Sequence, residues 1–205
     1  GVGGLIALLY GVIHHKVHAR FAALESQTAE AHMHRLGRAL ASRTSRLNVI
    51  LTEWSAWDET RDYILGTNPE YVETQGVATF LQTQQLDLLV FYDQRKEPVA
   101  SFYKEPDATQ PVALPPEFLS QLSGLRSLFD HADTRSSAGG MIKLGNTVYE
   151  IVAQPISNNE RAGAMYGTMI LGQQVSQETL DELSDFTQLS VMAWPLDEQD
   201  LSPLA

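Results

Sequence analysis

The chain has 205 residues, of which 43% are hydrophobic, so it can bury a core of its own. Its formal net charge is −11, and a field of that sign repels phosphate backbones, which argues against nucleic acid as a partner. The chain contains no cysteine, which excludes disulfides, thiolate metal sites and thiol nucleophiles.

Residues 1–13 form an uncharged apolar stretch, followed by a segment rich in histidine and basic residues at 14–20. The stretch is shorter than the roughly 20 residues that cross a bilayer. It lacks the basic start and the cleavage site of a signal peptide. We interpret 1–13 as the outer part of a transmembrane helix whose beginning lies outside the given sequence, with 14–20 at the lipid headgroups. The alternative is an amphipathic start to a soluble helix.

Residues 16–65 have the pattern of one long helix, because they contain no proline and a single glycine, Gly37. Apolar side chains recur at steps of three and four, in one stripe over 17–31 and a second, shifted in phase, over 36–57. Such a helix would be roughly 75 Å long, which exceeds the width of a domain of this size. We therefore expect 14–35 to project as a helical stalk that pairs with a partner helix in a homodimer.

Helices and strands follow in mixed order after this long helix. Further helices are expected at 69–85, 116–123, 125–130 and 176–186. Strands bounded by turn residues are expected at 86–93, 97–103, 140–144, 147–154, 164–172 and 188–194.

Short turns such as Gly145-Asn146 join neighbouring strands, which favours an antiparallel sheet. Helices at the ends of the sheet and over one face make the fold class α+β, with the long N-terminal helix packed on the sheet. We expect residues 36–205 to form a single domain.

No catalytic motif is present: the sequence has no phosphate-binding glycine loop, no nucleophile elbow and no metalloprotease helix. We therefore expect the chain not to be an enzyme and to bind no cofactor. His14 and His18, like Glu30 and His34, have the one-turn spacing of metal ligands, but no third ligand is near in sequence. We interpret these side chains as solvated.

The most informative segment begins at Trp54. Trp54 and Asp58 are four residues apart and share a helical face, which Asp62 continues. Aromatic walls with a few polar groups are typical of small-molecule sites, and a carboxylate would favour an amine or another hydrogen-bond donor. In the alternative, the tryptophans pack the helix on the sheet, Asp58 pairs with Arg61, and Asp62 binds the turn at 66–69.

The pattern Trp54-x-x-Trp57-Asp58, followed by aromatic and polar residues, resembles the fourth subtype of the CHASE sensor domains, which are extracellular sensory domains associated with cyclases and histidine kinases. The resemblance covers roughly 36–175. It departs at Thr74-Gln75 and at Gln173, where the family often has Asn and Arg. The other residues that carry it are Tyr63, Asn68, Tyr71, 88–93, 140–155, Gly163 and 167–172.

The resemblance implies a PAS-like or Cache-like sheet in a periplasmic domain of a bacterial inner-membrane protein, held between two transmembrane helices. It also implies control of a cytoplasmic diguanylate cyclase, cyclic di-GMP phosphodiesterase or histidine kinase. We expect a small ligand to bind on the concave face of the sheet and the long helix to relay the signal. The expected wall residues are Trp54, Trp57, Asp58, Tyr63, Tyr71, Tyr92 and Tyr149.

Two other interpretations stay open. One is an interaction module without a ligand, whose sheet face is filled by side chains and which signals through its dimer or a periplasmic protein partner. The other is a metal-responsive sensor that uses His32, His34 or acidic groups.

Overall fold

The computed structural model describes residues 31, 34–105, 108 and 110–187. The expected transmembrane segment at 1–13, most of the stalk at 14–35 and the last expected strand at 188–194 lie outside these residues. In the described part of the chain, no helix combines the length and the hydropathy that crossing a membrane would require.

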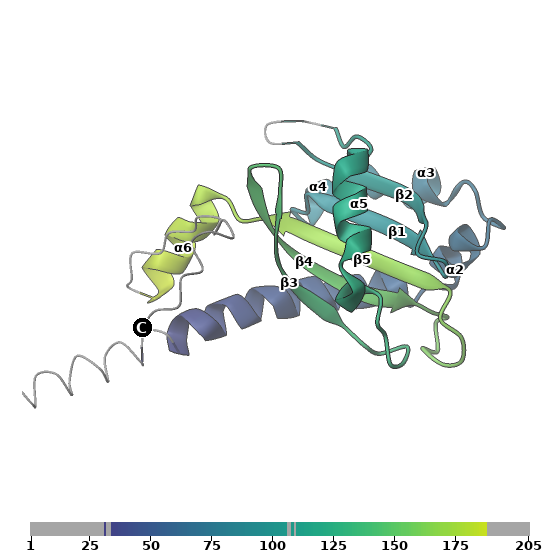
Figure 1. The fold of residues 1–205 in the computed structure, drawn as a ribbon, viewed down its shortest axis with the longest axis horizontal. Helices are drawn as coiled ribbons and strands as arrows, with labels where there is room; N and C mark the ends of the chain where they lie inside the picture. Colours follow the sequence, from purple (N-terminus) through teal and green to yellow (C-terminus); the bar gives the residue numbers. More distant parts are fainter. Residues whose placement is uncertain (1–30, 32–33, 106–107, 109, 188–205) are drawn as a thin grey trace, which may run out of the picture.

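Five strands form one antiparallel sheet in the order β2-β1-β5-β4-β3 (Figure 1). The first five expected strands are confirmed within a few residues, and so is the α+β class. The two tight hairpins join β1 to β2 and β3 to β4, and Gly145 in the second has the left-handed φ of 60° that such a turn needs. The strands are β1 (Leu88–Asp93), β2 (Pro98–Tyr103), β3 (Ala138–Leu144), β4 (Thr147–Ile156) and β5 (Gly167–Gln174).

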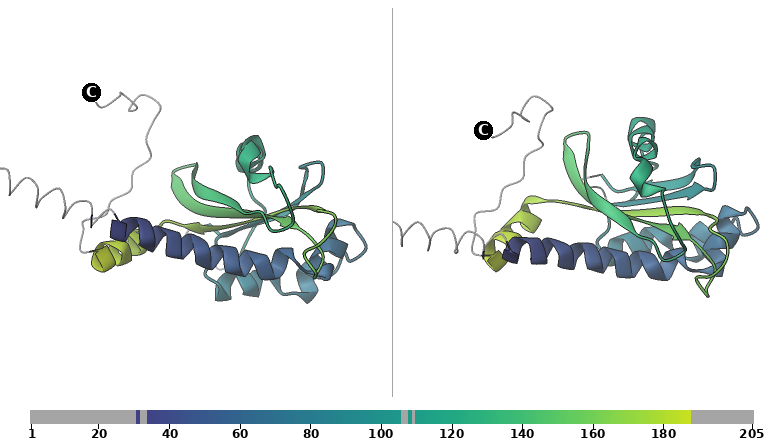
Figure 2. Two further views of the ribbon diagram at one scale, coloured as in Figure 1. Left: turned by 90° about the horizontal axis from the view of Figure 1, so that it is seen from below. Right: turned by 60° about the horizontal axis from the view of Figure 1, so that its bottom comes forward.

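Helices cover both faces of this sheet (Figure 2). The N-terminal helix, residues 34–55, lies on one face together with the next three helices, and α5 and η1 lie on the other. The remaining elements are α2 (Asp58–Ile64), α3 (Tyr71–Thr74), α4 (Val77–Thr83), α5 (Pro116–Gly124), η1 (Arg126–Leu128) and α6 (Gln177–Thr187).

The expectation of one unbroken helix over 16–65 is wrong, because the helix is interrupted before α2. Trp57 is extended, with φ −108° and ψ 136°. Tertiary hydrogen bonds take over at this point: the Ser157 N–H donates to the Ser55 carbonyl at 2.9 Å, and the Asp58 N–H donates to Asn159 Oδ1 at 3.0 Å. The break therefore follows from contacts with the β4–β5 loop.

The expected helix at 69–85 is also divided. Gly76 has a φ of 60°, in the left-handed region that glycine adopts without steric cost, and it separates α3 from α4. The chain thus turns between two short helices, both of which pack on the same face of the sheet.

Alternation along the strands sends neighbouring side chains to opposite faces. On β1, Leu89 and Phe91 join the core under the N-terminal helix, whereas Val90 and Tyr92 join the core under α5. The sheet therefore separates two hydrophobic cores.

The N-terminal helix runs along β4 in the same direction and contacts it through polar side chains. Glu150 and Gln154, both buried, face the helix from β4. Hydrogen bonds connect the helix to β4 and to Ser157, which follows that strand. They include Thr44–Glu150 at 2.5 Å, Thr52–Gln154 at 3.1 Å, Gln154–Asn48 at 3.1 Å and Ser55–Ser157 at 2.9 Å.

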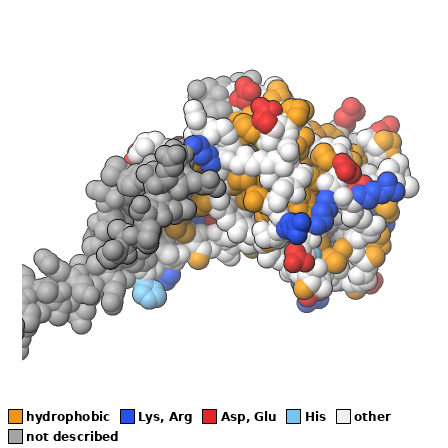
Figure 3. Space-filling model, in the orientation of Figure 1, with side chains coloured by type: hydrophobic (Ala, Val, Ile, Leu, Met, Phe, Trp, Pro, Cys, Tyr) orange, Lys and Arg blue, Asp and Glu red, His pale blue; other side chains and the backbone are white. Residues whose placement is uncertain are grey.

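On the face that carries α5, apolar side chains lie between charged ones of both signs (Figure 3). The net charge is therefore not gathered into one acidic patch on this face.

Two glycines allow a direct test of the packing between β1 and β5. A Cβ at Gly167 would lie 2.0 Å from the Tyr92 carbonyl oxygen, whereas a Cβ at Gly140 would meet nothing within 4 Å. We expect Gly167→Ala to lower the free energy of unfolding by about 2 kcal/mol and Gly140→Ala to leave it nearly unchanged. Urea unfolding measures both, and equal effects would contradict the close approach of the two strands.

Candidate functional site

Five of the seven expected wall residues lie on the side of the sheet that carries the N-terminal helix. Tyr71 is fully buried there, stacked on Tyr63 with ring centroids 5.1 Å apart. Its hydroxyl is 2.7 Å from the Thr60 hydroxyl, and burial raises the pKa of Tyr71 to about 12. This tyrosine is part of a packed core.

Trp54 stacks on Phe80 with ring centroids 3.8 Å apart, and it packs against the core of this face. Trp57 lies 5.6 Å from Trp54 and is 38% exposed. The first tryptophan of the motif thus holds helices on the sheet, and the second is on the surface.

Asp58 makes the ion pair considered above as its structural role. Arg61 Nη1 donates to Asp58 Oδ1 at 2.6 Å, and Arg61 also binds Asp62 at 2.7 Å. Asp58 Oδ1 further accepts the Asn159 N–H at 3.3 Å. The carboxylate therefore ties the start of α2 to the β4–β5 loop.

Tyr92 and Tyr149 lie on the opposite face, under α5. Both are fully buried, and the Tyr149 hydroxyl is 3.1 Å from the Tyr103 hydroxyl. Since the sheet stands between these tyrosines and the other five residues, the seven do not line one pocket.

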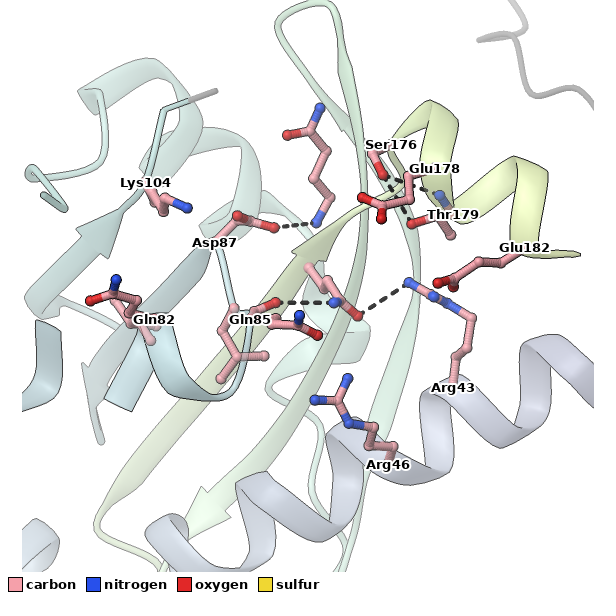
Figure 4. Close-up of a pocket in the computed structure, with 14 residues that line it drawn as sticks. Arg43, Arg46, Gln82, Gln85, Asp87, Lys104, Ser176, Glu178, Thr179 and Glu182 are labelled. Carbon is pink, nitrogen blue, oxygen red and sulfur yellow. Dashed lines mark hydrogen bonds between the residues drawn. The ribbon is translucent and has the colours of Figure 1, made fainter. Parts of the chain in front are cut away.

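A polar cavity of about 330 Å³ lies instead at one end of the sheet (Figure 4). It is bounded by the N-terminal helix, the end of α4, the ends of β1, β2 and β5, and α6. Figure 4 shows arginines rising from the N-terminal helix, Glu178 coming from α6, and Asp87 and Lys104 on the far side. The lining residues with charged side chains are Arg43, Arg46, Asp87, Lys104, Glu178 and Glu182.

Arg43 connects this cavity to the interior. Its Nε lies 3.3 Å from Glu150 Oε2, and its Nη2 donates to Gln173 Oε1 at 3.1 Å. Glu150 is 1% exposed, so this ion pair joins the N-terminal helix to a buried position on β4. A change at Arg43 therefore reaches β4 directly.

Asp87 lies just before β1 and lines the cavity with a partly buried carboxyl. Gln174 donates its N–H to Asp87 Oδ2 at 2.7 Å. Burial raises the pKa of Asp87, and this outweighs the lowering by the Gln174 N–H and by Lys104. The charged form of Asp87 is thus held at a cost to stability.

We expect Asp87→Asn to raise the Tm at pH 7. The folded state holds the Asp87 proton more tightly than the unfolded state, so its charge lowers stability as the pH rises, and the cost is complete above the folded pKa. The gain should vanish below about pH 3.9, the pKa of an unperturbed aspartate, where the carboxyl is protonated in both states. Thermal unfolding as a function of pH measures it, and a lower Tm at pH 7 would contradict the cost.

Sequence reasoning missed this cavity. Glu150 and Gln154 inside an otherwise apolar strand are the signal that could have indicated a polar face toward the helix. Asp87 and Lys104 flank expected strands and carry no motif. Within the described residues, no three His, Asp or Glu side chains are grouped so as to hold a metal ion.

Residues 39–193 match the model of the CHASE4 domain family. The chain is 22% identical over 131 residues to the methanogenesis regulatory histidine kinase FilI of Methanothrix harundinacea (strain 6Ac), a match that covers 64% of this chain and 15% of FilI.

Two solved structures share the fold at 12% identity, each over 78% of this chain. One is the extracellular domain of the histidine kinase vpHK1S-Z8, with a TM-score of 0.56 over 61% of that chain. The other is a domain of a sensory box/GGDEF family protein from Vibrio parahaemolyticus, with a TM-score of 0.52 over 64% of that chain. The chain thus spans under two thirds of each protein that it matches here.

Proposed function

The chain belongs to the CHASE4 domain family, and we propose that it is an extracytoplasmic sensor domain that binds a small polar molecule in the cavity between the N-terminal helix and α6. A CHASE4 segment is a sensor domain and not a catalytic one. The similarity to an extracellular domain of a histidine kinase supports a position outside the cytoplasmic membrane.

The position of the cavity is the observation that carries this proposal. Its walls come from the N-terminal helix and from α6, the first and the last helix that the structure describes, and from three strand ends between them. The two helices also border a second cavity, which Ala39 and Ser42 line together with Leu183. A molecule bound here touches both helices and the sheet at once.

The proposed relay passes through Arg43. A ligand that engages Arg43 competes with Glu150 and Gln173 for the guanidinium, and so changes how the N-terminal helix is held on β4. A ligand shifts such an equilibrium by its difference in affinity for the two arrangements. We propose that the resulting change in the position of the N-terminal helix is the signal that the domain transmits.

For the rest of the receptor, the relatives suggest the output. FilI is a histidine kinase and one structural relative is a GGDEF family protein, so we propose a cytoplasmic histidine kinase or a cyclic di-GMP cyclase or phosphodiesterase. We propose membrane attachment through flanking helices and a homodimer along the N-terminal helix. Val49 on that helix is 59% exposed, which supports a contact on its outer side.

A thermal-shift screen of the 205-residue chain against small polar molecules tests the proposal. A ligand at 100 times its Kd stabilises the folded state by about 2.7 kcal/mol, which is a shift of several degrees for a domain of this size. Arg46→Gln should abolish the shift, whereas Arg38→Gln, an exposed position on the same helix outside the cavity wall, should preserve it.

One observation favours a second function. Tyr92 and Tyr149 fill the α5 face of the sheet, as expected of an interaction module without a ligand. If no polar molecule raises the Tm, that function replaces the first, and the N-terminal helix and its dimer carry the signal.

A further inference from the structure

We propose that the molecule bound in the 330 Å³ cavity is a small zwitterion of the amino-acid class, with a carboxylate toward Arg43 and Arg46 and an ammonium toward Asp87 and Glu178. This inference rests on the proposed function, because it names the ligand of the same site.

The charges around the cavity are balanced, although the chain as a whole is strongly acidic. Three basic and three acidic side chains line the cavity. The basic ones are Arg43, Arg46 and Lys104, and the acidic ones are Asp87, Glu178 and Glu182. A wall that presents side chains of both signs favours a ligand that carries both charges itself.

Lys104 is close enough to Asp87 to lower the pKa of that carboxyl, but the two do not form an ion pair. In the described part of the chain, the ion pair that involves a cavity residue joins Arg43 to Glu150, and none joins a basic to an acidic residue of the cavity wall. A molecule with both charges can bind both signs at once, whereas a simple anion or cation leaves one set without a partner.

The walls also distinguish the two ends of the ligand. Arg46 lies on the exposed side of the cavity, binds the Gln84 carbonyl at 3.1 Å with one nitrogen, and has other N–H groups left to bind a carboxylate in forked geometry. Asp87 uses Oδ2 for the Gln174 N–H, and Oδ1 accepts no hydrogen bond from the described residues. An ammonium, which has three donors, can bind that oxygen.

The size and the floor of the cavity limit the rest of the molecule. The cavity is near the lower end of the roughly 300–1,000 Å³ that small-molecule sites occupy. Leu81 and Leu86, each 1% exposed, are the apolar residues of the lining. They offer a contact to a short side chain and little room for a large one.

Matched probes test this inference on the 205-residue chain by calorimetry. Each proteinogenic amino acid is titrated beside its deaminated acid and its decarboxylated amine, for example L-alanine beside propionate and ethylamine. We expect at least one amino acid with a short side chain to bind at least tenfold more tightly than both of its counterparts.

Two variants assign the ends of the ligand. Arg46→Gln should lower the affinity for the amino acid at least tenfold and leave the affinity for the amine unchanged. Asp87→Asn should also lower the affinity for the amino acid at least tenfold, and it should leave the affinity for the acid unchanged. Arg38→Gln and Asp130→Asn, both exposed and outside the cavity wall, serve as controls.

The outcomes separate the two proposals. If an acid or an amine binds as tightly as its amino acid, or if the polar screen yields ligands but no amino acid binds, the zwitterion is refuted and the polar-ligand sensor stands. If no molecule of either set binds, both proposals fail.

Discussion

Arg43→Met is expected to lower the free energy of unfolding by about 3 kcal/mol, because it leaves a carboxylate buried without its cation. Glu150 is 1% exposed and keeps its bond to the Thr44 hydroxyl, but a hydroxyl does not balance a full charge. Urea unfolding at pH 7 measures the loss.

The two partners of this ion pair should respond differently. Glu150→Gln should cost less than Arg43→Met, because the amide oxygen still accepts from Thr44 and the Arg43 side chain, already 21% exposed, can turn toward water. Arg38→Met is the matched control on the exposed side of the same helix. If Arg43→Met cost no more than this control, Arg43 and Glu150 would not be paired in solution.

Trp54→Ala should also cost about 3 kcal/mol, the loss that follows removal of a large aromatic side chain from a core. Its indole stacks on Phe80 at 3.8 Å and lies edge-on to Tyr71 at 6.4 Å, so the substitution opens a cavity between α3, α4 and the N-terminal helix. Thermal or urea unfolding gives the value.

The neighbouring tryptophan of the motif is the control. Trp57 is 38% exposed, so Trp57→Ala should cost about 1 kcal/mol or less. Similar losses for the two variants would show that Trp57 is as deeply packed as Trp54, contrary to the structure. Because neither residue lines the polar cavity, binding of a polar ligand should survive in Trp57→Ala.

Local patterns were sufficient to predict the five strands and their antiparallel pairing, but not the position of β5 between β1 and β4. The central strands β1 and β5 contain apolar runs, and the tight hairpin at Gly145 fixes the pairing of β3 with β4. The breaks in the helices were not predictable in the same way. The interruption at Trp57 depends on hydrogen bonds to Ser157 and Asn159, about a hundred positions away in the sequence, and helix propensity contains no information on such contacts.

The site was less accessible to sequence reasoning than the fold. The Trp54-x-x-Trp57-Asp58 pattern identified the family, but its residues mostly hold helices together and bind the β4–β5 loop. Tyr92 and Tyr149 were expected on the same wall, but both lie on the opposite face of the sheet. No local pattern shows which face of a strand will meet the N-terminal helix. The residues that line the polar cavity come from several elements, with only a few from each. Residues that are so far apart in the sequence do not form a recognisable motif.

The contact between the N-terminal helix and β4 has a mechanical consequence. Apolar surfaces can slide past one another gradually, but Glu150 and Gln154 hold the helix through directional hydrogen bonds to Thr44, Asn48 and Thr52. An axial displacement must break these bonds before equivalent groups, one helical turn or about 5.4 Å further on, can replace them. We therefore expect the helix to occupy a few discrete positions along the strand. Each molecule then responds to its stimulus in an all-or-none step, and a graded response reflects the fraction of molecules that have switched.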